Sequence, residues 1–171
     1  AASHVCGITA FTVKLTGRGE YGKENRVAVR LDTRESLDQP PFGHVIDYMT
    51  FGGIYRGVYL EGKEPAFLAD VFVRTPELDK ALVDLTLENS AMADTVGLTI
   101  LDGDGKTVFT GAAKAEAEIH SFPCPVPGAQ IWSPDSPALY TLEAALKDAA
   151  GNVLDVKKVR FGFRTARFEK D

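Results

Sequence analysis

The sequence predicts an all-β protein on two observations. Apolar and polar residues alternate in short runs that recur along the chain, and such runs place one face of a strand in a core and the other in water. Turn-forming glycine, asparagine and aspartate residues separate the runs, whereas helix signals are weak. The alternating runs are residues 11–15, 27–31, 71–74, 83–88, 96–100 and 140–146.

The connections between these runs predict two hairpins and several loops. Asp102-Gly103-Asp104-Gly105 supplies the positive φ angles of a tight hairpin, and Ala150-Gly151-Asn152 closes a second. Residues 112–118 and 142–150 contain good helix formers but fall within the strand rhythm, so both are predicted as strands or strand edges. Proline cannot donate to a central ladder, so the prolines at residues 40–41, 123–127 and 133–137 predict loops.

A domain boundary is predicted near Gly62-Lys63-Glu64-Pro65. After it come about seven predicted strands in about 100 residues, which is the number and spacing of an immunoglobulin-like sandwich. The segment before it is rich in glycine and holds three or four predicted strands, too few for a stable core of its own. We therefore expect domains at residues 1–64 and 65–171, the first being part of something larger.

Composition excludes several classes of protein. The chain has 171 residues, 44% of them hydrophobic and 25% charged, which is typical of a globular protein and too short for a barrel of about 250 residues. Its net charge is −5 and its basic residues are scattered, so no nucleic-acid partner is expected. No apolar run is long enough for a membrane span, and no membrane partner is expected. No signal-peptide pattern opens the chain, which leaves the compartment open and favours the cytoplasm.

Neither a metal nor a cofactor is expected. Asp102 to Lys106 resembles the opening of a calcium loop but lacks the remaining oxygen ligands, so the hairpin interpretation is preferred. The histidines and cysteines are too few and too far apart in sequence for a metal site. They are His4, His44, His120, Cys6 and Cys124. Cys124, between two prolines, is interpreted as an exposed or loosely buried thiol rather than a nucleophile.

Four motifs, in a fixed order over most of the chain, carry a family resemblance. They are GKENRVAVRLD at residues 22–32, FGGIYRGVYL at 51–60, WSPDSPALY at 132–140 and RFGFR at 160–164. Together they resemble glycoside hydrolase family 2, which includes β-galactosidases, β-glucuronidases and β-mannosidases. One departure is Gly57, where the family usually has an acidic residue after the arginine.

The resemblance implies a domain order and a role. Members of the family begin with a sugar-binding jelly roll, continue with an immunoglobulin-like sandwich and then carry the catalytic acids on a TIM barrel. By that order residues 1–64 are the end of the jelly roll, residues 65–171 are the sandwich, and the barrel lies outside this chain. We therefore expect a non-catalytic fragment of a retaining, β-galactosidase-type enzyme that acts on β-linked glycosides, with no catalytic residue in this chain and no activity alone.

Asp47 is the candidate substrate-binding residue. It lies six residues before Gly53 of the second motif. In several family members an aspartate at this spacing contacts a sugar hydroxyl, or a sodium ion, and a carboxylate suits either task. From the residues alone, a surface carboxylate or a turn cap remains the alternative.

A second class of function is a stand-alone carbohydrate-binding or adhesion module. Such a module usually presents a row of exposed aromatic residues, and this chain has one tryptophan. Trp132 is interpreted as packing against the nearby prolines and Tyr140 rather than as a sugar platform. If the jelly roll is only partial, its strands lack partners, so we expect self-association through the exposed apolar residues Phe11, Val27, Val29 and Leu31.

Overall fold

The computed structural model describes residues 2–5, 9–34 and 52–166. The chain divides into two compact units, Ala1–Leu60 and Glu61–Asp171. No helix in the described part of the chain is long and apolar enough to cross a membrane.

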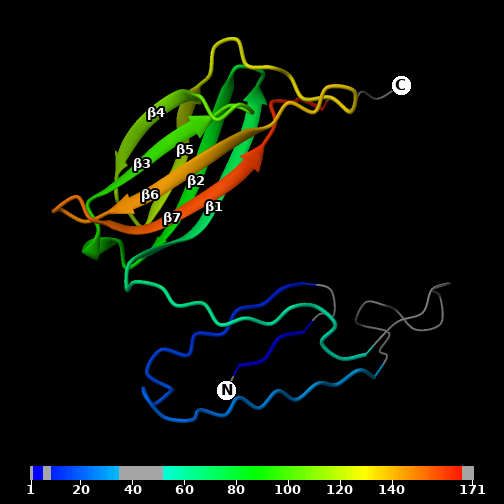
Figure 1. The fold of residues 1–171 in the computed structure, drawn as a ribbon, viewed down its shortest axis with the longest axis vertical. Coiled ribbons are helices and arrows are strands. Elements are labelled where there is room, and N and C mark those ends of the chain that lie inside the picture. Colours follow the sequence, from blue (N-terminus) through cyan, green and yellow to red (C-terminus); the bar gives the residue numbers. More distant parts are fainter. Residues whose placement is uncertain (1, 6–8, 35–51, 167–171) are drawn as a thin grey trace. The chain divides into compact units, whose positions relative to one another are not determined.

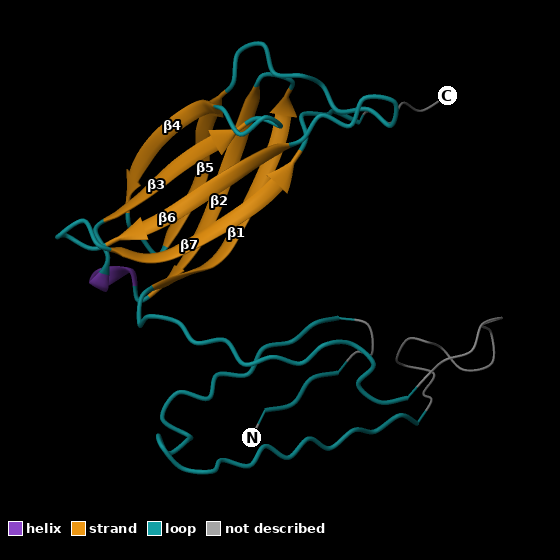
Figure 2. Ribbon diagram, viewed as in Figure 1, coloured by secondary structure: helices purple, strands orange, loops and turns teal. Residues whose placement is uncertain are grey.

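The second unit is a sandwich of two antiparallel sheets, shown in Figure 1 and coloured by structure type in Figure 2. One sheet has the order β1-β2-β5 and the other β4-β3-β6-β7. The strands are β1 (Phe67–Glu77), β2 (Lys80–Glu88), β3 (Thr95–Leu101), β4 (Thr107–Lys114), β5 (Glu118–Pro125), β6 (Tyr140–Lys147) and β7 (Val153–Phe161), with a 3-10 turn, η2 (Ser90–Met92), after β2. The prediction of an all-β sandwich is confirmed.

The core lies between the two sheets and is built by alternation. In β2, β3 and β6 every second side chain is buried, while the residues between them are more accessible. Burying a leucine or isoleucine side chain contributes about 1.5–3 kcal/mol, so these three strands supply much of the stability. Their buried residues are Ala81, Val83, Leu85, Leu87, Val96, Leu98, Ile100, Tyr140, Leu142, Ala144 and Leu146.

Both predicted hairpins are formed, and an aspartate organises each of them. Between β3 and β4, the Asp102 carboxylate accepts the backbone N–H groups of Asp104 and Lys106, and Gly105 takes a φ of 80°. Between β6 and β7, Asp148 accepts the N–H groups of Ala150 and Asn152. These bonds replace the ladder where each chain reverses, so the turn sequence determines where the strands end.

The loop predicted at residues 123–127 is wrong in its first part, because β5 continues to Pro125. Pro123 pairs with Leu82 and Pro125 with Lys80 of β2. β5 is the edge strand of its sheet, and a proline on an edge strand can turn its missing N–H away from the ladder. The loop predicted at residues 133–137 is confirmed, with Ser133 and Ser136 exchanging backbone hydrogen bonds.

The strands predicted at residues 11–15 and 27–31 are not formed. Strand structure requires a ladder of backbone hydrogen bonds to a neighbour, and alternation alone does not supply one. Every described residue from 2 to 60 is exposed. The local order comes from Asn25, whose side chain bonds to the backbone of Glu20 and Lys23 and closes the bend between the two runs.

Candidate functional site

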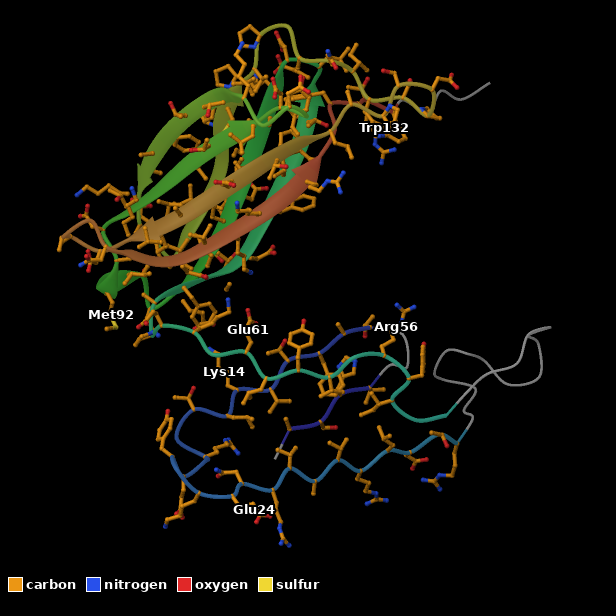
Figure 3. All side chains as sticks on the ribbon, in the orientation of Figure 1. Lys14, Glu24, Arg56, Glu61, Met92 and Trp132 are labelled. Carbon is orange, nitrogen blue, oxygen red and sulfur yellow. The ribbon has the colours of Figure 1, made fainter. Side chains whose placement is uncertain are left out.

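Asp47 and His44 lie outside the described residues, and the described chain resumes at Gly52. Gly52 lies against Thr33: a Cβ at Gly52 would come within 2.9 Å of the Thr33 Cγ2 atom. Gly53 has a φ of 96°, a conformation that favours glycine. The glycine pair therefore meets a local steric and conformational need. The Arg56 guanidinium, labelled in Figure 3, lies 5.8 Å from the ring centre of Tyr55.

The sandwich has a polar tie between β1 and β7 that sequence reasoning missed. The Asp155 carboxylate on β7 accepts the Leu68 N–H at 3.0 Å and lies 3.6 Å from the Lys63 ammonium. Next to it, the Lys157 ammonium donates to the Ala69 carbonyl at 2.7 Å. These bonds join strands of different sheets and fix the segment that enters β1. No sequence motif marks Asp155, because the Leu68 N–H that it accepts lies 87 residues away in the sequence.

A second polar cluster lies across β1, β2 and β5. The Arg74 guanidinium donates two hydrogen bonds to the Asp84 carboxylate, at 2.8 and 3.0 Å, and one to the Ser121 hydroxyl at 2.8 Å. The Ser121 N–H donates to Asp84 at 2.6 Å, and Ser121 takes a φ of 54°. The cluster lies at an irregularity in β2–β5 pairing, between Val83 and Leu85. The hydrogen bonds among Arg74, Asp84 and Ser121 join the three strands, so the cluster has a structural role.

These contacts determine how Asp84 titrates. The hydrogen bonds from Arg74, and then the Ser121 N–H, lower the pKa of Asp84 below its ordinary value of 3.8. The folded state therefore favours the ionised carboxylate. The resulting stability is complete above the unfolded-state pKa and is lost as the pH falls through the lower folded-state pKa.

We expect Asp84→Asn to be less stable than the parent chain at neutral pH but to lose less stability on acidification below about pH 4. Urea unfolding at a series of pH values measures both effects. Asp135→Asn, in an exposed loop, is the matched control and should follow the parent curve. Parallel curves for Asp84→Asn and the parent chain would contradict the assigned role.

Cys124 is fully buried, which corrects the prediction of an exposed or loosely buried thiol. Burial raises its pKa from 9.0 to about 12. Cys124 is buried because it lies on the core side of β5, where it pairs with Ala81 of β2, which is also fully buried. A thiol with so little thiolate is a packing residue rather than a nucleophile.

We expect Cys124 to react with a thiol reagent only as fast as the sandwich opens. At pH 8 a rise in pKa of this size lowers the thiolate fraction by about a thousandfold, before any loss of access is counted. Labelling of a Cys6→Ser variant in native buffer and in denaturant measures the difference. Rapid labelling in native buffer would contradict the burial.

Trp132 is half-buried and packs at the carboxyl end of β7. The Arg164 guanidinium lies 5.2 Å from the centre of the Trp132 ring. The backbone N–H of Trp132 donates to the Phe163 carbonyl at 2.9 Å. Gly162 is so close that a Cβ there would lie 2.8 Å from the Trp132 Cβ. Tyr140 packs against Phe161 and Phe163, and its hydroxyl accepts the Gln130 N–H. Figure 3 labels Trp132 at this end of the sandwich, where the indole is a packing residue.

An open cleft of about 670 Å³ lies beside Gly162 and Arg164, which both contact Trp132. The residues that line it are Phe72, Val73, Arg74, Thr75, Pro76, Phe161, Gly162, Arg164 and Ala166. A smaller hollow of about 250 Å³ shares Gly162 and Arg164 with it. The lining holds no carboxyl, imidazole or thiol group, and its one hydroxyl, that of Thr75, donates to the Arg164 carbonyl. The described residues also hold no group of three or more metal-ligating side chains.

Comparison with known proteins gives a consistent family. A model described as "Glycosyl hydrolases family 2" matches residues 66–164. A β-galactosidase of Thermoanaerobacter pseudethanolicus is 31% identical over 98% of this chain and 24% of its own length. A putative β-glucuronidase of Formosa agariphila is 31% identical over 99% of this chain and 21% of its own.

A solved structure agrees with these sequence relatives. The β-glucuronidase of Bifidobacterium dentium, complexed with coumarin-3-O-glucuronide, superposes with a TM-score of 0.54 and 29% identity. The superposition covers 61% of this chain and 19% of the β-glucuronidase chain. The chain thus spans about a quarter or less of the length of the relatives described here. With the family model matching well over half of its residues, the chain belongs to glycosyl hydrolases family 2.

Proposed function

We propose that this chain is a non-catalytic part of a retaining glycosidase that hydrolyses terminal β-linked sugars, of the β-galactosidase type. The observation that carries the proposal is the match, along 98% of this chain, to 24% of the β-galactosidase of Thermoanaerobacter pseudethanolicus. A β-galactosidase of Rhizobium meliloti is also similar, at 29% identity over 85% of the chain.

Three described carboxyl groups, Asp32, Asp84 and Asp148, have lowered pKa values and structural partners, unlike a general acid. A retaining glycosidase needs a general acid with a raised pKa and a nucleophilic carboxylate about 5 Å away. Here Arg34 lowers the pKa of Asp32, Arg74 lowers that of Asp84, and Asn152 lowers that of Asp148. Such carboxylates stay ionised and serve as hydrogen-bond acceptors for structure.

The proposal includes a division of labour. Residues 1–64 are the end of a sugar-binding domain, and residues 65–171 are an immunoglobulin-like sandwich that connects it to a catalytic barrel. The strand order of the sandwich, with β1, β2 and β5 facing β4, β3, β6 and β7, is compatible with that assignment.

The test has two arms. The purified chain should not hydrolyse aryl β-galactosides or β-glucuronides above a mock purification. A chimera in which this chain replaces the matched part of the Thermoanaerobacter β-galactosidase should retain aryl β-galactosidase activity. Turnover by the chain alone would disprove the non-catalytic role, and a folded chimera without activity would disprove the assigned position in the enzyme.

Asp47 remains the proposed sugar contact, supported by its spacing from Gly53. In the same chimera, Asp47→Asn should lower kcat/KM at least about tenfold, since it removes a charge-assisted hydrogen bond to the substrate. Asp104→Asn, in the exposed β3–β4 turn, is the matched control. Equal kcat/KM for the two variants would remove Asp47 from the site.

The alternative is a stand-alone carbohydrate-binding module. It is favoured only by the open cleft beside Phe72, whose ring is 56% exposed. Calorimetric titration of the chain with galactose, lactose and glucuronic acid separates the two functions. Tight binding would support the module, and no binding would support the enzyme fragment.

A further inference from the structure

The turn between β3 and β4 contains two Asp-Gly pairs in succession, Asp102-Gly103 and Asp104-Gly105, and the sequence has no others. The glycine of such a pair lacks a Cβ, so its backbone nitrogen can approach the carboxyl carbon of the preceding aspartate with little steric hindrance. Bond formation between these two atoms closes a five-membered imide ring within the main chain. Residues 103–106 are exposed, so water also reaches the turn.

The carboxylate of Asp102 is held by two hydrogen bonds. Its Oδ1 atom accepts the backbone N–H of Asp104 at 3.0 Å and that of Lys106 at 2.9 Å. Ring closure draws the carboxyl carbon onto the Gly103 nitrogen and so displaces Oδ1 from both donors. A Cβ at Gly103 would also lie 3.7 Å from the Leu139 carbonyl, so this side of the turn is in contact with the rest of the sandwich.

The carboxylate of Asp104 is held less firmly. It has no hydrogen-bond or ion-pair partner among the residues that the structure describes. The Gly105 N–H donates to the Asp102 carbonyl at 3.1 Å, near the long end of the range for such bonds, and attack by the Gly105 nitrogen breaks this bond. A Cβ at Gly105 would meet nothing within 4 Å, which leaves room for the ring. Ring closure therefore costs fewer hydrogen bonds at Asp104 than at Asp102.

We propose that Asp104 is a modification site, at which aspartate isomerises to isoaspartate without an enzyme. In the first step the Gly105 nitrogen bonds to the carboxyl carbon of Asp104. The proton of that nitrogen and the hydroxyl of the protonated carboxyl group leave together as water.

In the second step one water molecule adds to the imide and opens it. Attack at the former side-chain carbonyl restores aspartate. Attack at the main-chain carbonyl leaves the chain running through the side-chain carbon atoms, which is isoaspartate. The composition is unchanged and water is the only other reactant. The longer main chain moves the Gly105 N–H away from the Asp102 carbonyl, at the turn that leads into the edge strand β4.

The first experiment locates the isomer by peptide mapping of the 171-residue chain after prolonged incubation in neutral buffer. Electron-transfer fragmentation distinguishes isoaspartate from aspartate at each position. In the folded chain isoaspartate should form at Asp104 about fivefold faster than at Asp102, because one further hydrogen bond must break at Asp102. In urea that unfolds the chain, the two Asp-Gly pairs should react at similar rates, since only the fold distinguishes them.

The second experiment measures isoaspartate with a protein isoaspartate methyltransferase, which transfers a labelled methyl group to it. Asp104→Glu should lose most of the label, because a six-membered ring forms less readily. Gly103→Ala is the matched control: it hinders ring closure at Asp102 alone, and its Cβ makes only an ordinary contact. This variant should be labelled as strongly as the parent chain. Unchanged fluorescence of Trp132 shows that both variants are folded.

Three results would overturn the proposal. They are equal rates at Asp102 and Asp104 in the folded chain, faster reaction at Asp102, and no isoaspartate at Asp104 when the unfolded chain forms it. Full labelling of Asp104→Glu would also place the isomer elsewhere. Because the chain is assayed without a sugar substrate, these outcomes are independent of the proposed glycosidase role.

Discussion

Replacing Phe163 with alanine is expected to destabilise the sandwich by about 3–5 kcal/mol. Phe163 is completely buried, and it is among the largest fully buried side chains of the described residues. Its ring packs edge-on against Tyr140, with centroids 5.0 Å apart, and against Phe161 at 5.3 Å. Removing the ring leaves a cavity that two rigid aromatic neighbours cannot fill, so both the transfer and the cavity costs apply.

Urea unfolding of the second unit, followed by circular dichroism, measures the loss. Phe72→Ala is the matched control, because the Phe72 ring is 56% exposed on β1 and should cost well under half as much. A loss at Phe163 no larger than the loss at Phe72 would show that the carboxyl end of β7 is not part of the core.

Gly162→Ala is expected to cost about 1–3 kcal/mol by overpacking. The new Cβ would lie 2.8 Å from the Trp132 Cβ and 3.0 Å from its Cγ. Trp132 cannot easily move away from the new Cβ, because its backbone N–H donates to the Phe163 carbonyl and Arg164 lies against its ring. The strain should therefore move the indole or the end of β7.

Trp132 is the single tryptophan, so its fluorescence reports the change directly. Gly162→Ala should shift the emission towards that of a solvated indole and lower the urea midpoint. Gly62→Ala is the control, since a Cβ there meets nothing within 4 Å. An unchanged emission spectrum together with an unchanged midpoint would mean that Trp132 is not held at this position.

The sequence was sufficient to predict the sandwich because its strands carry their own signals. Val96, Leu98 and Ile100 alternate with polar or small residues, and the aspartate and glycine residues after them admit only a turn. The loop predicted at Pro123 and Pro125 is wrong, because the rule against proline in a ladder applies to central strands. Whether a strand is central depends on sheet order, which no local pattern contains.

The polar ties could not be predicted for the same reason. Arg74, Asp84 and Ser121 meet only because β1, β2 and β5 adopt one particular register with an irregularity beside Asp84. In the first unit the alternation predicts strands at residues 11–15 and 27–31 that are not formed, because a strand needs a neighbour. Asp47 lies outside the described residues, so its role remains a prediction from spacing.

The ties between β1 and β7 also have a mechanical consequence. Leu68 is bonded to Asp155, Ala69 to Lys157 and the Thr75 hydroxyl to the Arg164 carbonyl, so the two strands run in the same direction. The chain enters the sandwich at the start of β1 and leaves at the end of β7, at opposite ends of this seam. A pull on the two ends therefore loads the three bonds in shear, all at once, rather than opening them one after another.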